Sequence, residues 1–471
     1  MNAVARRKEL FGGAASAVIS RVGSFGAMVV SQAIVARVLS EEDFAAFGVF
    51  WVAGVLFSTI SSEGVSLVFT RRVQQYRNAD DHNHRATLLR NSVKVLATFV
   101  GAEVAVSLLV LLLFRNAFPA TIQRVMNFAG YLFVWSILLS LIAFAGEVAR
   151  ATGRNLYAAI LSGTNGNVAV NVPFLLLIAT SFAMIDAKSS LNQVLQVLLA
   201  LSVIVMVPST LWLMNCCRKN HGEIAQQGNS LTSYRGVLGE ALPAVGVTLA
   251  SQINLTIDVI LLAFFLPPAE IASIYVVRRL MTFVNAAMML VSLTIRPYVA
   301  RLYVKNELGS LRRLVKSGTY LGVMASIAPL CLFLIFPAWT MGLFGQHYSV
   351  HAVYLQLAAI GGLVNVITGP CSVILQMAGR QRALLIVTIL VGIVNLATLS
   401  IGAYVWGGMG AMVAIMCNII ISNLASWLVG WYVLGFESSV YLSGEERTWL
   451  WNRARDSLGR IPAGLRKKGI G

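Results

Sequence analysis

Two long apolar segments in the middle of the sequence carry charged side chains inside them. Asp258 stands nine residues before Pro267, in the turn that joins the two segments, and Arg278 and Arg279 stand eight and nine residues after Glu270 on the other side of that turn. If both segments are helices, the acid and the bases lie at a similar depth, roughly 12 Å at about 1.5 Å per residue. Charges that far into hydrocarbon usually face a bundle interior or a water-filled cavity. These residues therefore predict the wall of a transport cavity.

Two further charges lie in the first two apolar segments. Arg21 stands about a dozen residues into the first segment, and Glu63 stands eight residues before Arg71 in the second. The two could pair, as Asp258 could pair with one of the hairpin arginines. The alternative interpretation is that such charges form static ion pairs between helices, or that the arginines extend to the nearer interface.

The two adjacent arginines are not expected to act alike. Neighbouring residues on a helix point about 100° apart. We therefore expect that Arg278 and Arg279 do not both face the cavity.

Amide side chains are frequent inside the apolar segments, and we take Asn254 and Asn285 as cavity candidates beside the charged residues. Sugar hydroxyls need hydrogen-bonding partners of this kind. The alternative for each residue is a hydrogen bond between helices, worth under about 1 kcal/mol in lipid. The amides are Asn165, Asn167, Asn171, Asn254, Asn285, Asn365, Asn395, Asn418, Gln32, Gln252 and Gln376.

No catalytic or metal-binding pattern is present in the sequence. The five histidines lie in loops or at segment ends, and neither an HExxH pattern nor a GxxxxGK[ST] nucleotide loop occurs. The five cysteines show no paired spacing, so neither a disulfide framework nor a metal site is indicated. We expect a protein that is not an enzyme and uses no metal or cofactor.

Composition places the chain in the membrane. Of its residues 57% are hydrophobic and 12% charged, whereas soluble domains carry about twice that charged fraction. Apolar runs of about 20 residues recur, each long enough to cross a hydrocarbon core of about 30 Å. The net charge of +17 comes from residues in short loops between these runs. Membrane topology explains that charge better than nucleic-acid binding does.

We expect an all-α integral membrane protein with twelve transmembrane helices. The spans are predicted at Phe11–Val38, Phe44–Phe69, Val93–Phe114, Phe128–Ala149, Tyr157–Ala183, Leu191–Asn215, Val237–Leu266, Ile271–Ile295, Leu314–Phe336, Val353–Met377, Leu384–Val405 and Gly410–Gly435. Alternate loops carry nearly all the Lys and Arg residues, which indicates that these loops and both termini are cytoplasmic. A basic tail containing Trp449 and Trp451 follows, either as a helix on the inner leaflet or as a disordered segment.

An internal repeat divides the chain into two halves. Residues Thr152–Ile160 match Ala378–Ile386 at an offset of 226, and Leu39–Val49 resembles Leu266–Val276 at an offset of 227. That offset covers six helices, so the halves share one orientation, and parallel repeats place the substrate between them near the midplane. The predicted organisation is a six-helix lobe (1–215), a cytoplasmic linker (216–236), a second six-helix lobe (237–436) and a basic cytoplasmic tail (437–471).

Several stretches together resemble the bacterial polysaccharide flippases of the MOP superfamily. Ala36–Phe44, followed by Ser62–Gly64, is similar to the opening of these proteins, although Ser40 stands where glycine is typical. Leu266–Glu270 resembles the start of their second half. Three later motifs are similar to their eleventh and twelfth helices, namely Gly379-Arg380, Val394-Asn395 and Gly407–Ala411.

The resemblance implies a two-lobed, MATE-like fold that moves an undecaprenyl-diphosphate-linked oligosaccharide from the cytoplasmic to the periplasmic leaflet of the inner membrane. Family members commonly have a basic central cavity, and Arg21, Arg278 and Arg279 suit it because guanidinium groups bind phosphate in a bidentate manner. The resemblance also implies contacts with membrane lipids, a polysaccharide polymerase and a chain-length regulator. It leaves the O-antigen, exopolysaccharide and capsule pathways open.

Three other functions fit the same pattern. A cation-coupled multidrug antiporter of similar fold would use membrane carboxylates such as Glu63, Glu103 and Asp258, but would not favour arginines in its cavity. A lipid II flippase typically resembles a version with fourteen helices, against the twelve spans here. A membrane subunit of a secretion complex that transports nothing is the third.

Overall fold

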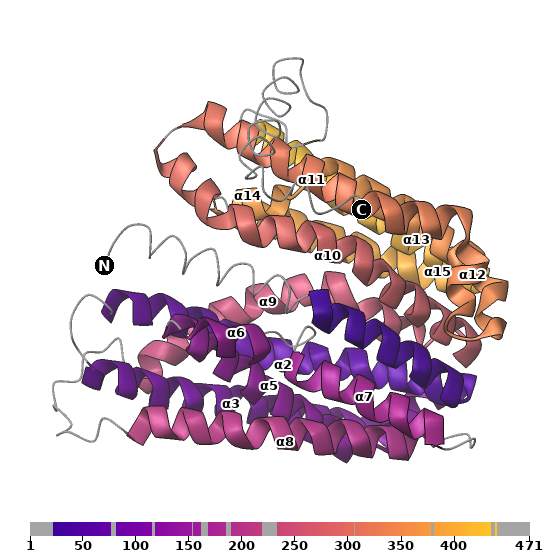
Figure 1. Ribbon diagram of the computed structural model, residues 1–471, viewed down its shortest axis with the longest axis horizontal. Coiled ribbons are helices and arrows are strands. Elements are labelled where there is room, and N and C mark those ends of the chain that lie inside the picture. The colour runs from indigo at the N-terminus through magenta and orange to yellow at the C-terminus, as the bar shows by residue number, and fades with distance from the viewer. Residues whose placement is uncertain are drawn as a thin grey trace, which may run out of the picture.

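The computed structural model describes residues 22–76, 82–114, 118–152, 154–161, 168–184, 190–218, 233–305, 307–377, 381–434 and 439, and every regular element in these ranges is a helix (Figure 1). The elements are the helix Val22–Val38, α2 (Glu41–Tyr76), α3 (His82–Phe114), α4 (Ala120–Met126), α5 (Ala129–Ala151), α6 (Asn155–Leu161), α7 (Val168–Met184), α8 (Leu191–Arg218), α9 (Tyr234–Leu262), α10 (Pro268–Val304), α11 (Leu308–Ile335), α12 (Pro337–Gly342), the 3-10 helix η2 (Gln346–His351), α13 (Ala352–Thr368), α14 (Cys371–Met377) and α15 (Gln381–Leu434).

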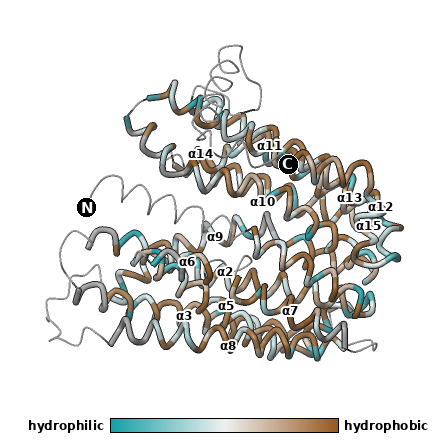
Figure 2. Tube along the Cα trace, in the orientation of Figure 1, coloured by the Kyte–Doolittle hydropathy of each residue, from teal (hydrophilic) through white to brown (hydrophobic). Residues whose placement is uncertain are grey.

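The long helices confirm the predicted all-α membrane fold with twelve spans. Eight helices are long and apolar enough to cross a membrane, and the bent helix α9 makes a ninth. Val22–Val38 and Val168–Thr180 are shorter apolar helices that match the first and fifth predicted spans. The eleventh and twelfth spans lie within α15, on either side of a kink at Gly407. Figure 2 shows hydrophobic residues along these helices and hydrophilic residues mainly near their ends.

One predicted span is broken in the structure, and another is described only in part. The tenth, Val353–Met377, is formed by α13 and α14, which are separated at Gly369 and Pro370. Gly369 has φ +77°, a left-handed conformation that glycine adopts without steric cost, and proline cannot continue the preceding helix. The fifth, Tyr157–Ala183, is formed by α6 and α7, with residues 162–167 outside the described ranges.

The start of α2 shows why a helix begins where it does. The side-chain oxygen of Ser40 accepts a hydrogen bond from the backbone N–H of Asp43 at 3.2 Å, which caps the first turn. That turn also contains Glu41 and Glu42, and acidic residues there interact favourably with the helix dipole. The serine that departs from the family pattern therefore acts as a helix cap.

The helices form two groups with α9 between them. In Figure 1 the elements α2 to α8 lie below and α10 to α15 lie above, while α9 runs between the groups. Helix α9 packs against α2 of the first half and against α15 of the second. It bends by 60° between Tyr234–Gln252 and Thr256–Leu262, so its two parts run in different directions.

An aromatic seam, defined as Phe44, Trp51, Tyr275 and Tyr348, joins the two halves. The ring of Phe44 lies 5.6 Å from the ring of Tyr275 and 5.9 Å from that of Tyr348, measured between centroids. Phe44 is on α2, Tyr275 on α10 and Tyr348 on η2, so one buried ring contacts both elements of the second half. Aromatic pairs in such arrangements are worth about 0.5–1.5 kcal/mol beyond their buried area.

A second contact between the halves lies at the basic end of the bundle, defined as the end that carries Arg71 and Arg72. Arg72 makes two contacts with Glu240 of α9, at 2.7 Å from Nη2 and 3.1 Å from Nε. The side chain of Arg72 is 4% exposed, whereas that of Glu240 is 45% exposed. This paired geometry holds the first part of α9 against α2.

The joint within α15 has no connecting loop. Gly407 has φ +60° and ψ −145°, and at this single non-helical residue the chain folds back so far that Gly410 lies against the backbone of Gly402. The next residue, Gly408, packs on Tyr354 and on Glu270 in the first turn of α10, where an added Cβ would lie 2.3 Å from the Tyr354 hydroxyl and 2.6 Å from Glu270 Oε2. The last two spans are therefore joined by a turn that only small residues allow.

Candidate functional site

An ion pair joins the two helices of the central hairpin. The Asp258 carboxylate on α9 accepts a hydrogen bond from Nη1 of Arg278 on α10. Their side chains are 13% and 26% exposed, so both are largely removed from solvent. The Asp258 carboxylate also accepts a hydrogen bond from the backbone N–H of Val259 at 3.0 Å. The sequence placed these charges at similar depth from the turn, and the structure brings them into contact.

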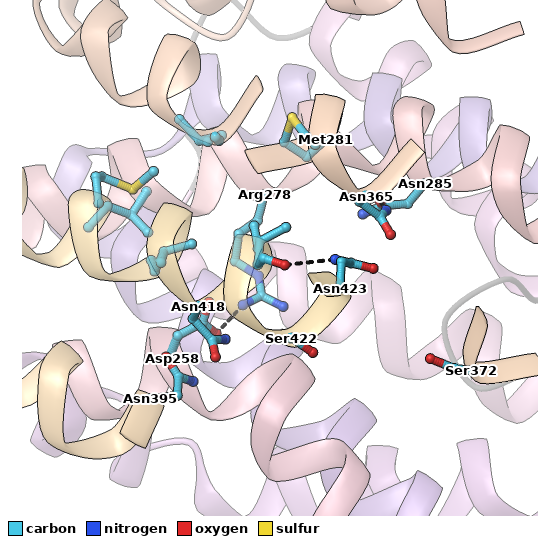
Figure 3. Close-up of a pocket in the computed structure, with 17 residues that line it drawn as sticks. Asp258, Arg278, Met281, Asn285, Asn365, Ser372, Asn395, Asn418, Ser422 and Asn423 are labelled. Carbon is cyan, nitrogen blue, oxygen red and sulfur yellow. Dashed lines mark hydrogen bonds and ion pairs between the residues drawn. The ribbon is translucent and has the colours of Figure 1, made fainter. Parts of the chain in front are cut away.

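The ion pair forms part of the wall of a cavity of about 480 Å³ (Figure 3). This volume is within the range of about 300–1,000 Å³ that is typical of ligand pockets. All of its lining residues come from α9, α10, α13, α14 and α15, so the cavity lies within the second half. The polar lining residues are Asp258, Arg278, Asn285, Asn365, Ser372, Asn395, Asn418, Ser422 and Asn423.

Some of the cavity amides bond within the protein, and others present unpartnered atoms. Asn365 donates to the Asn285 side-chain oxygen at 3.2 Å, and Asn423 donates to a backbone carbonyl of its own helix at 2.8 Å. The side-chain oxygens of Asn395 and Asn418 have no hydrogen-bond partner among the described residues, although both are buried. Figure 3 shows these two asparagines near Asp258. Buried polar atoms normally have partners, so these oxygens indicate a place for a hydrogen-bond donor.

Arg279 points away from the cavity and into the contact between the halves. Its guanidinium lies 4.4 Å from the ring of Tyr275 and 5.7 Å from that of Trp51. Nη2 donates to the Tyr275 hydroxyl at 2.8 Å, and Nη1 lies 3.7 Å from the sulfur of Met28. The residue is 6% exposed, so this cation is held by aromatic faces rather than by water. The different directions of the two arginines follow from their separation around the helix.

Of the other predicted site residues, Glu63 lies away from this cavity, and two fall outside what the structure describes. Arg21 lies outside the described residues, and so does the side chain of Asn254, although Asn254 belongs to α9. Glu63 is exposed on α2 and does not line the cavity. Glu103 instead accepts a hydrogen bond from Ser61, across α3 and α2. The site as described therefore contains Asp258, Arg278 and Asn285 of the predicted set.

Sequence reasoning missed much of the polar wall. Asn365, Asn395 and Asn418 stood out only as members of a large set of amides, and no sequence signal separated Ser422 and Asn423 from other polar residues. The spacing of Asn418 and Ser422 was a usable signal, because residues four apart lie on the same helix face. Their meeting with α10 and α13 depends on packing between helices that are distant in sequence.

The described residues contain no group of three or more His, Cys, Asp or Glu side chains that could hold a metal ion. Asp258 is the single carboxylate among the residues that line the cavity, and it contacts a guanidinium. The arrangement is suited to hydrogen bonding with a polar ligand.

Solved structures of similar fold are membrane transporters. An inward-facing multidrug resistance MATE family transporter of the MOP superfamily aligns with a TM-score of 0.68 and 13% identity, over 89% of this chain and 98% of its own. The lipid II flippase MurJ, in an inward closed conformation, aligns with a TM-score of 0.64 and 13% identity, over 87% of this chain and 86% of its own. A mutant of the Vibrio cholerae MATE transporter VcmN aligns with a TM-score of 0.62 and 16% identity, over 91% and 97%. The fold is thus that of the MOP-superfamily transporters.

Sequence profiles give the family within that class. The profile of the family described as "Polysaccharide biosynthesis protein" matches residues 10–280, more than half of the chain. The chain belongs to this family. The MatE profile matches residues 243–401, in the second half. No curated protein matches the sequence.

Proposed function

We propose that this protein is a flippase that moves an undecaprenyl-diphosphate-linked oligosaccharide from the cytoplasmic to the periplasmic leaflet. The observation that carries the proposal is the amide-rich cavity beside the Asp258–Arg278 pair, in a member of the polysaccharide biosynthesis protein family. Amides and hydroxyls both donate and accept hydrogen bonds, as sugar hydroxyls do. A cavity built from such groups suits a carbohydrate.

The proposed membrane orientation follows the distribution of basic residues. Under this proposal the basic end of the bundle faces the cytoplasm of a bacterial inner membrane, and both termini are cytoplasmic. The polysaccharide polymerase and the chain-length regulator would receive the flipped product on the periplasmic side. The two six-helix lobes, 1–215 and 237–436, would move against each other during transport.

The aromatic seam supports transport by alternating access. It joins the halves at the end opposite the basic end, where Phe44 contacts Tyr275 and Tyr348. A substrate that enters from the cytoplasm would leave only after this seam separates. The aromatic contacts are short-ranged and lie apart from the polar cavity. Binding of the substrate in the cavity and separation of the seam can therefore occur at different times.

A cation-coupled multidrug antiporter is the second candidate function. The match of the MatE profile to residues 243–401 favours it. Such a protein needs a carboxylate that exchanges a proton or a cation for the drug. Asp258 is the carboxylate among the cavity-lining residues, but the adjacent Arg278 guanidinium already neutralises it, which weakens this alternative.

The test is deletion of the gene in its bacterial host, with the lipid-linked oligosaccharide quantified on each face of the inner membrane. The flippase proposal expects the intermediate to accumulate on the cytoplasmic face and surface polysaccharide to fall. Unchanged polysaccharide with higher sensitivity to cationic compounds would instead support the antiporter. Restoration by the wild-type gene on a plasmid controls for effects on neighbouring genes.

A further inference from the structure

The cavity in the second half is electrically balanced. Among the described residues that line it, Asp258 and Arg278 are the charged ones, and they are paired with each other. An acidic sugar or a diphosphate bound here would have to compete with Asp258 for the guanidinium, while Asp258 would repel it. A cation bound here would be repelled by the Arg278 guanidinium. The charge arrangement therefore favours an uncharged ligand.

The unpartnered amide oxygens specify what that ligand must offer. Asn395 is a cavity-lining residue that is 3% exposed, and its enclosed side-chain oxygen has no hydrogen-bond partner among the described residues. The side-chain oxygen of Asn418 is also enclosed and has no partner among the described residues. Asn418 lies on the other side of the kink at Gly407 in the same helix, α15. Two acceptors in one small space call for a ligand with more than one donor, such as neighbouring hydroxyls on a ring.

The other wall of the cavity is apolar. Ile274, Val277 and Met281 lie on α10, and Met412 and Ile415 lie on α15. A pyranose ring has hydroxyls at its edge and C–H groups on its faces, so it can bond to the amides and pack against these side chains at once. A bare metal ion would use neither the apolar wall nor most of the volume of about 480 Å³.

We propose that this asparagine cavity is a subsite for one neutral sugar residue of the transported oligosaccharide, with the side chains of Asn395 and Asn418 accepting hydrogen bonds from its hydroxyl or acetamido groups. The inference rests on the flippase function proposed above and adds a specificity to it. Because the cavity belongs wholly to the second half, the bound sugar moves with that half during transport. The diphosphate is bound elsewhere.

The test is binding of small sugars to the purified full-length protein in lipid nanodiscs, measured by thermal unfolding. Ligands that bind the folded state raise the unfolding temperature. The probes are glucose, N-acetylglucosamine and N-acetylgalactosamine, compared with glucuronate, inorganic pyrophosphate and sodium chloride. We expect at least one neutral sugar to stabilise the protein more than any of the three ionic probes. Greater stabilisation by an anion or by sodium alone, or none by any neutral sugar, would overturn the proposal.

Variants connect the effect to the cavity. Asn395→Ala and Asn418→Ala should each weaken sugar binding by about twofold to tenfold, the effect of one lost hydrogen bond. Asn418→Leu keeps the branched shape of the side chain without its polar atoms and serves if the alanine variants fold poorly. Asn192→Ala, an amide on α8 outside the cavity, is the matched control and should bind as the wild type does. Equal binding by all four variants would contradict the assignment.

An export assay separates this inference from the function on which it rests. In the deletion strain, the wild-type gene should restore surface polysaccharide, and the Asn395→Ala/Asn418→Ala double variant, present at equal level in the membrane, should restore much less. Full restoration by the double variant would refute the subsite while the flippase function stands. Polysaccharide export that does not depend on the gene at all would refute the flippase function itself.

Discussion

At the scale of single residues, two adjacent arginines have opposite surroundings. Arg278 pairs with Asp258 at the cavity, whereas Arg279 lies between the rings of Tyr275 and Trp51. The charge of Arg278 is balanced by a carboxylate, whereas that of Arg279 is stabilised by the negative faces of aromatic rings. Only the first can exchange its partner for a polar ligand without separating the two halves of the protein.

The first prediction concerns the ion pair. Arg278→Ala should destabilise the protein by about 1–3 kcal/mol, because it leaves the Asp258 carboxylate buried without its partner. Adding Asp258→Asn should recover part of that loss, since no unpaired charge then remains. Thermal unfolding of the two single variants and the double variant in detergent measures the coupling.

The surface pair Glu147–Arg150 provides the control, since its arginine is 48% exposed and the pair is local on α5. Arg150→Ala should reduce the free energy of unfolding by less than about 1 kcal/mol.

In the export assay, Arg278→Lys should retain activity if charge alone matters and lose it if the planar guanidinium is needed. Full export by Arg278→Ala would remove this residue from the site.

At the scale of helices, hydropathy and turn chemistry were enough to predict most elements. Each span needs an apolar run of about 20 residues, which makes such spans visible in any sequence. The break at Gly369–Pro370 had a local signal that the length of the apolar run concealed. No sequence signal predicted that Asn395 and Asn418 line the same cavity as residues of α10, because this depends on how helices distant in sequence pack.

The second prediction concerns the turn inside α15. Gly410→Ala should destabilise the protein by about 1–3 kcal/mol, because the new methyl group would lie 2.2 Å from the backbone carbonyl oxygen of Gly402, which cannot rotate away as a side chain can. Gly430→Ala in the same helix is the control, since no atom lies within 4 Å of the place that its new methyl group would take. That change should be neutral or stabilising by up to about 1 kcal/mol. Equal unfolding temperatures for the two variants would contradict the close packing.

At the scale of the whole molecule, α9 connects two halves that must move. Its first part is fixed to α2 by the Arg72–Glu240 pair, while its second part presents Asp258 to the cavity of the second half. A motion of one half is thereby transmitted along α9 to the ion pair. The bend of 60° in this helix lies between these two attachments.

The third prediction tests that attachment. Glu240→Ala should lower export, because it leaves the buried Arg72 guanidinium without its carboxylate partner and frees α9 from α2. A cysteine placed at Val245, which packs on Gly64 of α2, should then react faster with a maleimide reagent. Glu307→Ala, at an exposed position before α11, is the control and should change neither. Unaltered labelling in Glu240→Ala would show that the ion pair does not hold the helix.

The joint at Gly407 also affects how the chain is made. Because the last two spans are connected by a single reversed residue, no hydrophilic segment separates them as they leave the ribosome. If one span crossed the bilayer alone, the apolar span attached to it by this turn would be left in water, which is unfavourable in proportion to its apolar surface. We therefore expect the two spans to enter the membrane together as one hairpin, which then packs against α13 and α14.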